Sequence, residues 1–295
     1  MSYAGFSSFV APARARADLW LTLVGAVLIL ILYALGAWAV LEAAAWALPG
    51  GASVAALVEG TSPTGALVLL FHFVAMALAA MIVVRLIHRR GALTLLGNRE
   101  RLTRDFLRTA GIAILVAGFA TGLILTFVGV SWKGNAGLWI ALLPLALPLI
   151  LLQTGAEELV FRGYLLQQLG ARFGVGLRAV WLFLPALLFA LGHVSFEEQG
   201  ANAWAIFAVT LLFAVITADM TARTGSLGAA WGLHFINNVQ ALLVISLMGP
   251  LSGLSLGTVP MTAAMPAVLP LLAADAAALL IVYSVWRWRE RSHAA

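Results

Sequence analysis

Eight apolar segments of membrane-spanning length follow one another along the 295-residue chain. A helix that crosses a bilayer needs about 20 consecutive, mostly apolar residues. We expect such helices at 19–47, 64–87, 107–130, 138–170, 178–195, 201–220, 226–248 and 264–286. Because backbone polar groups have no water to bond inside a bilayer, regular helices are the natural way to satisfy them. The sequence therefore predicts an all-α, polytopic membrane bundle of about eight transmembrane helices.

The composition supports a membrane location over a water-soluble one. Hydrophobic residues make up 63% of the chain and charged residues only 10%, whereas soluble domains carry roughly 25% charged residues. The chain contains no cysteine, so neither disulfide bonds nor thiol chemistry is available to it. The first apolar segment is longer than a signal-peptide core and no cleavage site follows it, so we interpret it as a span. With no linker or repeat dividing the sequence, we expect one membrane domain over residues 1–295.

The basic residues are distributed on one side of the predicted helices. A net charge of +5 would suggest nucleic-acid binding in a soluble chain, but here the arginines lie at the ends of apolar segments. They occupy positions 14, 16, 85, 89, 90, 99, 101, 104, 108, 172, 178, 223, 287, 289 and 291, and the opposite loops hold Lys133, Glu42, Glu59, Glu197 and Glu198. Because cytoplasmic loops are enriched in Lys and Arg, we expect both termini in the cytoplasm and no nucleic-acid partner.

The fourth apolar segment carries two adjacent carboxylates and an arginine. Each charge near the bilayer centre costs at least ~2.5–3.5 kcal/mol on insertion scales, so such residues usually face a protein interior or a cavity. Glu158 and Arg162 are four residues apart, which places them on one helix face where they can pair. Glu157 is rotated by ~100° from Glu158 and stays available for other contacts. A polar clamp between helices is the structural alternative.

Two histidine-bearing segments, the end of the fifth helix and the interior of the seventh, are expected to meet this segment. Glu157 precedes position 175 by 18 residues and His193 follows it by 18. If the fourth and fifth helices are antiparallel neighbours, both residues stand ~25 Å from the turn between them. His234 lies inside the seventh helix at a shallower depth, and Asn238 shares its face one turn later, with Asn237 the less favoured amide. We therefore predict a polar cavity inside the membrane.

This set of side chains suggests hydrolysis by an activated water. The sequence lacks the His-Glu-x-x-His zinc signature and the Gly-x-Ser-x-Gly elbow of serine hydrolases. Glu157 would take a proton from a water that His193 orients, which makes the water a nucleophile for an amide carbonyl. His234 and Asn238 would donate hydrogen bonds to the oxyanion that then develops.

Other polar residues in or near the apolar segments have structural interpretations. We expect His72 to be a satisfied core residue, and His88 and His293 to lie among arginines at the membrane interface. Asp219 and Arg223 are four residues apart and are predicted to form a structural pair. Asp275 lies in the middle of the last apolar segment without a partner in its own helix, and the sequence gives it no function.

The polar motifs together resemble those of a known protease family. Glu157-Glu158-x-x-x-Arg162, Phe189-x-x-x-His193 and His234-x-x-x-Asn238 occur in this order on successive segments. They resemble the CPBP family of intramembrane proteases, the CAAX-protease and bacteriocin-processing (Abi) group that includes the type II CAAX prenyl endopeptidase. The stretch Asp219 to Asn238 is typical of bacterial members, which implies a bacterial inner membrane. The resemblance covers about residues 140–245.

The resemblance implies an eight-helix bundle whose active-site cavity opens toward the cytoplasm. It implies that Glu157 and His193 activate the water and that His234 and Asn238 form the oxyanion hole. Glu158, Arg162 and Phe189 would support these four residues. We expect no cofactor and a peptide or membrane-protein substrate, such as a pheromone, a bacteriocin precursor or a membrane segment.

Three alternatives to this interpretation stay open. Two carboxylates and two histidines could hold zinc, which would make the protein a metal-dependent membrane peptidase. A non-catalytic scaffold or immunity protein of the same fold would bind a partner without cleaving it. A small transporter would use the intramembrane carboxylates to relay protons, although the sequence lacks the inverted repeat common in transporters.

Overall fold

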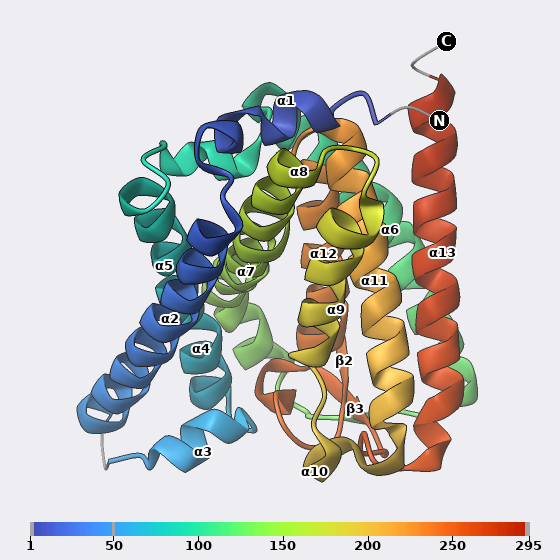
Figure 1. The fold of residues 1–295 in the computed structure, drawn as a ribbon. Helices are drawn as coiled ribbons and strands as arrows, with labels where there is room; N and C mark the ends of the chain where they lie inside the picture. The colour runs from blue at the N-terminus through green and yellow to red at the C-terminus, as the bar shows by residue number, and fades with distance from the viewer. Residues whose placement is uncertain (1–2, 49–50, 293–295) are drawn as a thin grey trace.

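The computed structural model describes residues 3–48 and 51–292 as a helical bundle (Figure 1). Its first half contains α1 (Phe6–Val10), η1 (Ala11–Arg16), α2 (Leu19–Ala47), α3 (Val54–Glu59), α4 (Pro63–Phe71), α5 (Phe73–Leu86), η2 (Ala92–Leu96), α6 (Arg99–Phe127), β1 (Ser131–Trp132), α7 (Ala136–Glu158), η3 (Leu159–Leu166) and α8 (Gln167–Phe173). Its second half contains η4 (Ala179–Phe183), α9 (Leu184–Leu191), α10 (Phe196–Gln199), η5 (Gly200–Asn202), α11 (Ala203–Thr224), α12 (Gly228–Val239), η6 (Gln240–Val244), β2 (Ile245–Leu247), η7 (Ser252–Leu254), β3 (Gly257–Val259), η8 (Pro266–Val268) and α13 (Leu269–Ser292). The predicted all-α class is confirmed. The segments η3, η4 and η6 are π-helical.

Six helices of the described chain are long and apolar enough to cross a membrane. They cover Leu19–Ala47, Pro63–Leu86, Arg99–Phe127, Ala136–Phe173, Phe196–Thr224 and Pro266–Ser292. The protein is therefore an integral membrane protein by length and composition of its helices. The count of about eight is not confirmed, because the expected fifth helix is the shorter stretch Ala179–Leu191. The expected seventh ends at Val244, where the apolar sequence continues as strand β2.

The two ends of the bundle are built differently. In Figure 1, α1, α8 and the last turns of α13 lie at one end, and α3, α10, β2 and β3 lie at the other. The strands form a three-stranded sheet in the order β1-β3-β2, with β1 antiparallel and β2 parallel to β3. The sequence did not predict these strands, because they are only two or three residues long.

Helix α12 packs unusually close to α6 through two glycines. A β-carbon at Gly228 would lie 2.2 Å from the carbonyl oxygen of Leu102, and one at Gly232 would lie 2.4 Å from that of Phe106. Glycines four residues apart allow two membrane helices to bring their backbones into contact. Since α12 carries His234, this contact fixes the height and rotation of that imidazole.

The pair predicted near the end of α11 is confirmed. Arg223 Nε lies 2.5 Å from Asp219 Oδ2, and the hydroxyls of Tyr3 and Tyr283 also donate to this carboxylate, at 2.8 and 2.7 Å. Tyr3 belongs to the N-terminal segment, which closes this end of the bundle. The pair is therefore a structural anchor for that segment.

Two of the predicted structural histidines are placed by the structure. His72 is satisfied as expected, because its Nε2 lies 2.9 Å from the hydroxyl of Tyr33. His88 is buried, with Nε2 2.9 Å from the hydroxyl of Tyr164 and with the side chain of Gln168 2.8 Å from Nδ1. His293 lies outside the described residues.

Candidate functional site

The two adjacent carboxylates end helix α7, and both are buried. The predicted pair is confirmed, because Arg162 Nη1 lies 3.1 Å from Glu158 Oε1 with both side chains almost fully enclosed. Arg162 Nη2 also donates to the hydroxyl of Thr217 on α11 over 2.5 Å. Removing one member of such a buried pair would leave a bare charge, so this pair has a clear structural role.

The imidazole of His234 contacts both carboxylates. Its Nδ1 lies 2.9 Å from Glu158 Oε1, and its Nε2 lies 3.3 Å from Glu157 Oε2. The first contact is a hydrogen bond in which Nδ1–H donates to the carboxylate. The second contact is an ion-pair distance without hydrogen-bond geometry, and Glu157 Oε2 has no hydrogen-bond partner within the described chain. Four groups thus form a continuous line from Glu157 through His234 and Glu158 to Arg162.

An unsatisfied buried oxygen is the most informative feature of this line. Buried polar atoms are nearly always hydrogen-bonded, and an exception calls for a water, an ion or a chemical role. Oε2 of Glu157 can accept a proton or a hydrogen bond from a water without breaking an existing bond. Oε2 of Glu158 is also buried without a hydrogen-bond partner in the described chain. Glu158 differs from Glu157 because its Oε1 is held by both Arg162 and His234, which fixes its carboxylate in the ion pair.

Phe189 on α9 packs between the charged line and His193. Its ring centroid lies 4.5 Å from the guanidinium carbon of Arg162, which is a cation–π distance. The same ring is 4.5 Å from the ring of His193 and 5.9 Å from the ring of His234. The phenylalanine of the Phe189-x-x-x-His193 motif therefore packs against all three of these residues.

His193 follows the end of α9 and is exposed in the structure. Its Nδ1 lies 2.8 Å from the carbonyl oxygen of Phe189. Because a carbonyl oxygen only accepts hydrogen bonds, Nδ1 carries the proton, and Nε2 of the neutral ring is a free acceptor. The structure gives His193 no hydrogen bond or ion pair with Glu157, and the imidazole that contacts Glu157 is that of His234.

The amide of Asn238 is held by a residue that the sequence interpretation omitted. Asn238 Nδ2 donates to Gln153 Oε1 over 2.7 Å, and Gln153 is buried one turn before Glu157 on α7. The signal was present in the sequence, because a glutamine four residues before Glu157 lies on the same helix face. Gln153 therefore belongs to the candidate site.

A pocket of about 120 Å³ lies beside these residues. It is lined by Phe189, His193, Val209, Thr210, Phe213, His234, Asn237, Asn238, Asp275 and Leu279. Three of the four predicted catalytic residues line it, and Glu157 lies next to it through its contact with His234. The pocket has room for a few waters or one side chain. Asp275, which had no assigned function, brings a further carboxylate to the pocket from α13.

The zinc alternative requires a set of metal ligands among these side chains. Zinc in proteins takes three or four ligands from His, Cys, Asp and Glu. Within residues 3–48 and 51–292, no group of three or more such side chains is arranged to hold a metal ion. Glu157 and Glu158 each contact His234, and Glu158 also pairs with Arg162.

Comparison with known proteins adds an independent observation. Residues 138–240 match the family described as type II CAAX prenyl endopeptidase Rce1-like. The predicted resemblance to CAAX proteases is confirmed over this segment. It includes all seven predicted site residues, from Glu157 to Asn238, and relates them to membrane endopeptidases of the CAAX-protease type.

One curated relative and the solved structures complete the comparison. The Bacillus subtilis (strain 168) protein YyaK, described as uncharacterized, is 36% identical over 115 residues. This match covers 38% of the present chain and 37% of the relative's length. No solved structure matches the chain.

Proposed function

We propose that this protein is an intramembrane endopeptidase that hydrolyses a peptide bond with a water activated by Glu157. The observation that carries the proposal is the buried Oε2 of Glu157, which has no hydrogen-bond partner in the described chain and faces His234 at 3.3 Å. The match of residues 138–240 to the Rce1-like CAAX endopeptidases supports it.

The proposed reaction assigns one task to each side chain. Glu157 accepts a proton from the water, and Nε2 of His193 accepts a hydrogen bond from the same water and orients it. The water oxygen attacks the carbonyl carbon. The negative charge that develops on the carbonyl oxygen receives hydrogen bonds from Nε2–H of His234 in its imidazolium form, whose Nδ1–H stays on Glu158, and from the second amide N–H of Asn238, whose first stays on Gln153. Glu157 then returns its proton to the leaving amine nitrogen as the carbon–nitrogen bond breaks.

The surrounding residues hold these groups in place. Glu158 accepts the Nδ1 proton of His234 and pairs with Arg162, so the imidazole is oriented before substrate arrives. Gln153 holds the amide of Asn238. Such preorganised donors act strongly because they do not reorient during the reaction.

We further propose that the two shorter helices also cross the membrane, which gives eight spans with both termini in the cytoplasm of a bacterial inner membrane. The helix α9 packs against α11, and α12 packs against α6, α7 and α11, so both lie among longer spans. The proposed substrate is a peptide or a membrane-protein segment, and no cofactor takes part.

The proposal is tested by cleavage of a membrane-peptide library with the reconstituted full chain. Glu157→Gln removes the base and should lower the cleavage rate on the order of a hundredfold or more. Glu197→Gln is the matched control, because Glu197 is exposed on α10 outside the site, and it should keep the wild-type rate. Mass spectrometry of the products identifies the bond that is cut.

Two results would contradict the proposal. Cleavage that is equally fast in Glu157→Gln and in wild type would remove Glu157 from the chemistry. Peptide binding without cleavage, equal in both proteins, would favour a non-catalytic scaffold of this fold.

A further inference from the structure

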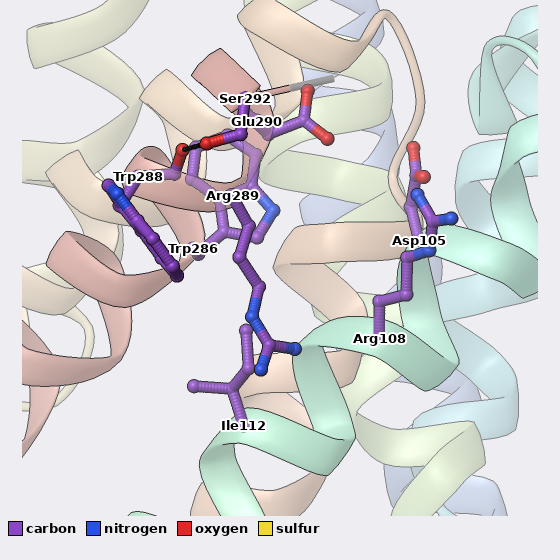
Figure 2. A pocket seen from close by; sticks show the side chains of 8 residues that line it. All are labelled: Asp105, Arg108, Ile112, Trp286, Trp288, Arg289, Glu290 and Ser292. Carbon is purple, nitrogen blue, oxygen red and sulfur yellow. Dashed lines mark hydrogen bonds between the residues drawn. The ribbon is translucent and has the colours of Figure 1, made fainter.

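A second pocket lies between α6 and α13 and shares no lining residue with the pocket of the candidate site. It has a volume of about 430 Å³ and is lined by Asp105, Arg108 and Ile112 of α6 and by Trp286, Trp288, Arg289, Glu290 and Ser292 of α13. Figure 2 shows Arg289 extending from α13 toward Ile112 on α6. Side chains of two different helices therefore converge at one polar depression.

The polar depression continues into an apolar groove. A neighbouring pocket of about 530 Å³ shares Arg108, Ile112 and Arg289 with the first one. Its remaining lining residues are Leu107, Gly111, Leu115, Val116 and Val285. The two pockets thus form one surface feature, polar at the arginine-rich end and apolar along the helices.

The length of this groove fits one leaflet of a bilayer. From Asp105 to Val116 the helix α6 advances by eleven residues, or ~16 Å at 1.5 Å per residue. Half of a hydrocarbon core of ~30 Å is about the same length. The groove therefore has the height of one acyl chain, with its polar end at the level of the headgroups.

The polar end is lined by two arginines and two carboxylates, and further arginines next to it pair with the carboxylates. Its two carboxylates are already paired within the protein, because Asp105 contacts Arg101 at 3.0 Å and Arg104 at 3.3 Å, and Glu290 contacts Arg101 at 3.4 Å. The side chain of Arg108 has neither a hydrogen bond nor an ion pair with the described residues and is exposed. An anion placed against Arg108 would therefore meet no unpaired carboxylate.

We propose that this groove binds an anionic phospholipid, with the phosphate at Arg108 and one acyl chain along Leu107, Gly111 and Leu115. Arginine is well suited to a phosphate because its guanidinium donates two parallel hydrogen bonds. Trp288 lies beside the arginines with 67% of its surface exposed, and tryptophan prefers the level of the lipid headgroups. This binding site is independent of the proposed peptidase activity.

Gly111 provides a test that leaves every charge in place. A β-carbon at Gly111 would meet no atom within 4 Å, so the space above this residue is open. Gly111→Leu should fill the acyl part of the groove without a clash and should favour the helix, since glycine is a poor helix former. Because this variant changes no charged residue, a loss of lipid binding in it would come from the apolar part of the groove alone.

The experiment titrates the detergent-solubilised full chain with phosphatidylglycerol, phosphatidylcholine and soluble glycerol 3-phosphate. Bound lipid is counted by native mass spectrometry for wild type, Arg108→Gln, Gly111→Leu and the control Arg85→Gln. Arg85 is an exposed arginine of α5 at the end of its helix and is outside the groove. Thermal unfolding without added lipid verifies that each variant is folded.

We expect wild type and Arg85→Gln to prefer phosphatidylglycerol to phosphatidylcholine. Arg108→Gln should weaken phosphatidylglycerol binding about tenfold, which is the effect of losing one charge-assisted contact. Gly111→Leu should also weaken the binding of phosphatidylglycerol, because it fills the part of the groove that holds the acyl chain. Equal binding of both lipids, or an equal loss in Arg85→Gln and Arg108→Gln, would overturn the proposal. Arg108-dependent binding of glycerol 3-phosphate as tight as that of the lipid would also overturn it, in favour of a soluble anion.

Discussion

The Nε2 atom of His234 lies 3.3 Å from Oε2 of Glu157, although helices α8, α9, α10 and α11 lie between the two residues in the sequence. This contact joins the residue proposed as base to the residue proposed as oxyanion donor. The proposed base and the proposed oxyanion donor are therefore in contact before any substrate is present.

Glu158→Gln and Arg162→Ala should destabilise the fold more than Glu157→Gln does. Glu158 and Arg162 form a fully buried pair, and breaking such a pair costs roughly 3–5 kcal/mol because a bare charge remains. Glu157 has no hydrogen-bonded partner at Oε2, so its amide replacement should be mild. Thermal unfolding in detergent compares the three variants, and equal midpoints would contradict this division.

Chelators should leave the cleavage activity unchanged. The reason is that the proposed mechanism uses a carboxylate and two imidazoles and no metal ion. In the same mechanism His193 orients the water, so His193→Ala should abolish cleavage in a protein that still folds. Activity is measured during titration with EDTA and phenanthroline, with elemental analysis of the same sample. A different outcome would contradict this mechanism: the chelator removes the activity, zinc restores it, and elemental analysis finds about one zinc ion per chain. Glu157, His193 and His234 would then be zinc ligands.

Asp275 should determine which peptides are cleaved fastest. It is a carboxylate that lines the small pocket with His193 and Asn238, so a peptide with lysine beside the scissile bond should be preferred over one with norleucine. Asp275→Asn should reduce this preference about tenfold, as expected for one charged hydrogen bond, while the norleucine peptide is unaffected. An equal loss for both peptides would show that Asp275 serves the general structure of the pocket.

The stability of the fold should decrease when the pH falls below about 6.5. Burial lowers the pKa of His88, which lies between α5 and η2, and the charge of Arg90 lowers it further against the opposing effect of the Arg16 carbonyl. The unfolded chain therefore binds the proton more readily, so acid favours unfolding and the contribution is complete only above that pH. Thermal unfolding as a function of pH should give a flatter profile for His88→Gln; profiles that run parallel would contradict the assignment.

A reporter that is active only outside the cytoplasm should give no signal when fused to the C-terminus. The prediction depends on the arginines, which gather at the end of the bundle where α8 ends and α13 ends. A fusion to the loop around Lys133 is the matched control, because it follows α6 at its other end and should be active. A strong signal from the C-terminal fusion would overturn the eight-span topology.

The local parts of the site were predictable from spacing alone. Glu158 and Arg162 pair because residues four apart share a helix face, and the same rule gave Asp219 and Arg223. The contact of His234 with Glu158 was not predictable in this way, because it joins segments 76 residues apart. It depends on how α12 is rotated against α7, and an apolar pattern says little about that rotation.

Hydropathy also did not predict where two of the helices end. The predicted seventh span ran to residue 248, but the chain leaves its helix after Val244 and forms β2. A short apolar stretch has the same hydropathy in a helix and in a buried strand. The fifth span was predicted to end at residue 195, but α9 ends four residues earlier at Leu191, so His193 lies beyond the helix.

The glycine contact between α6 and α12 also limits where a substrate can enter. With backbone against backbone at Gly228 and Gly232, these two helices have no side-chain layer between them that could rearrange. A peptide therefore cannot reach His234 by parting them. The remaining approaches run past α9, α11 and α13, whose side chains line the rest of the pocket. Under the proposed function, a substrate would therefore enter between helices that contact one another through side chains, because the two glycines of α12 leave no space for entry on the side of α6.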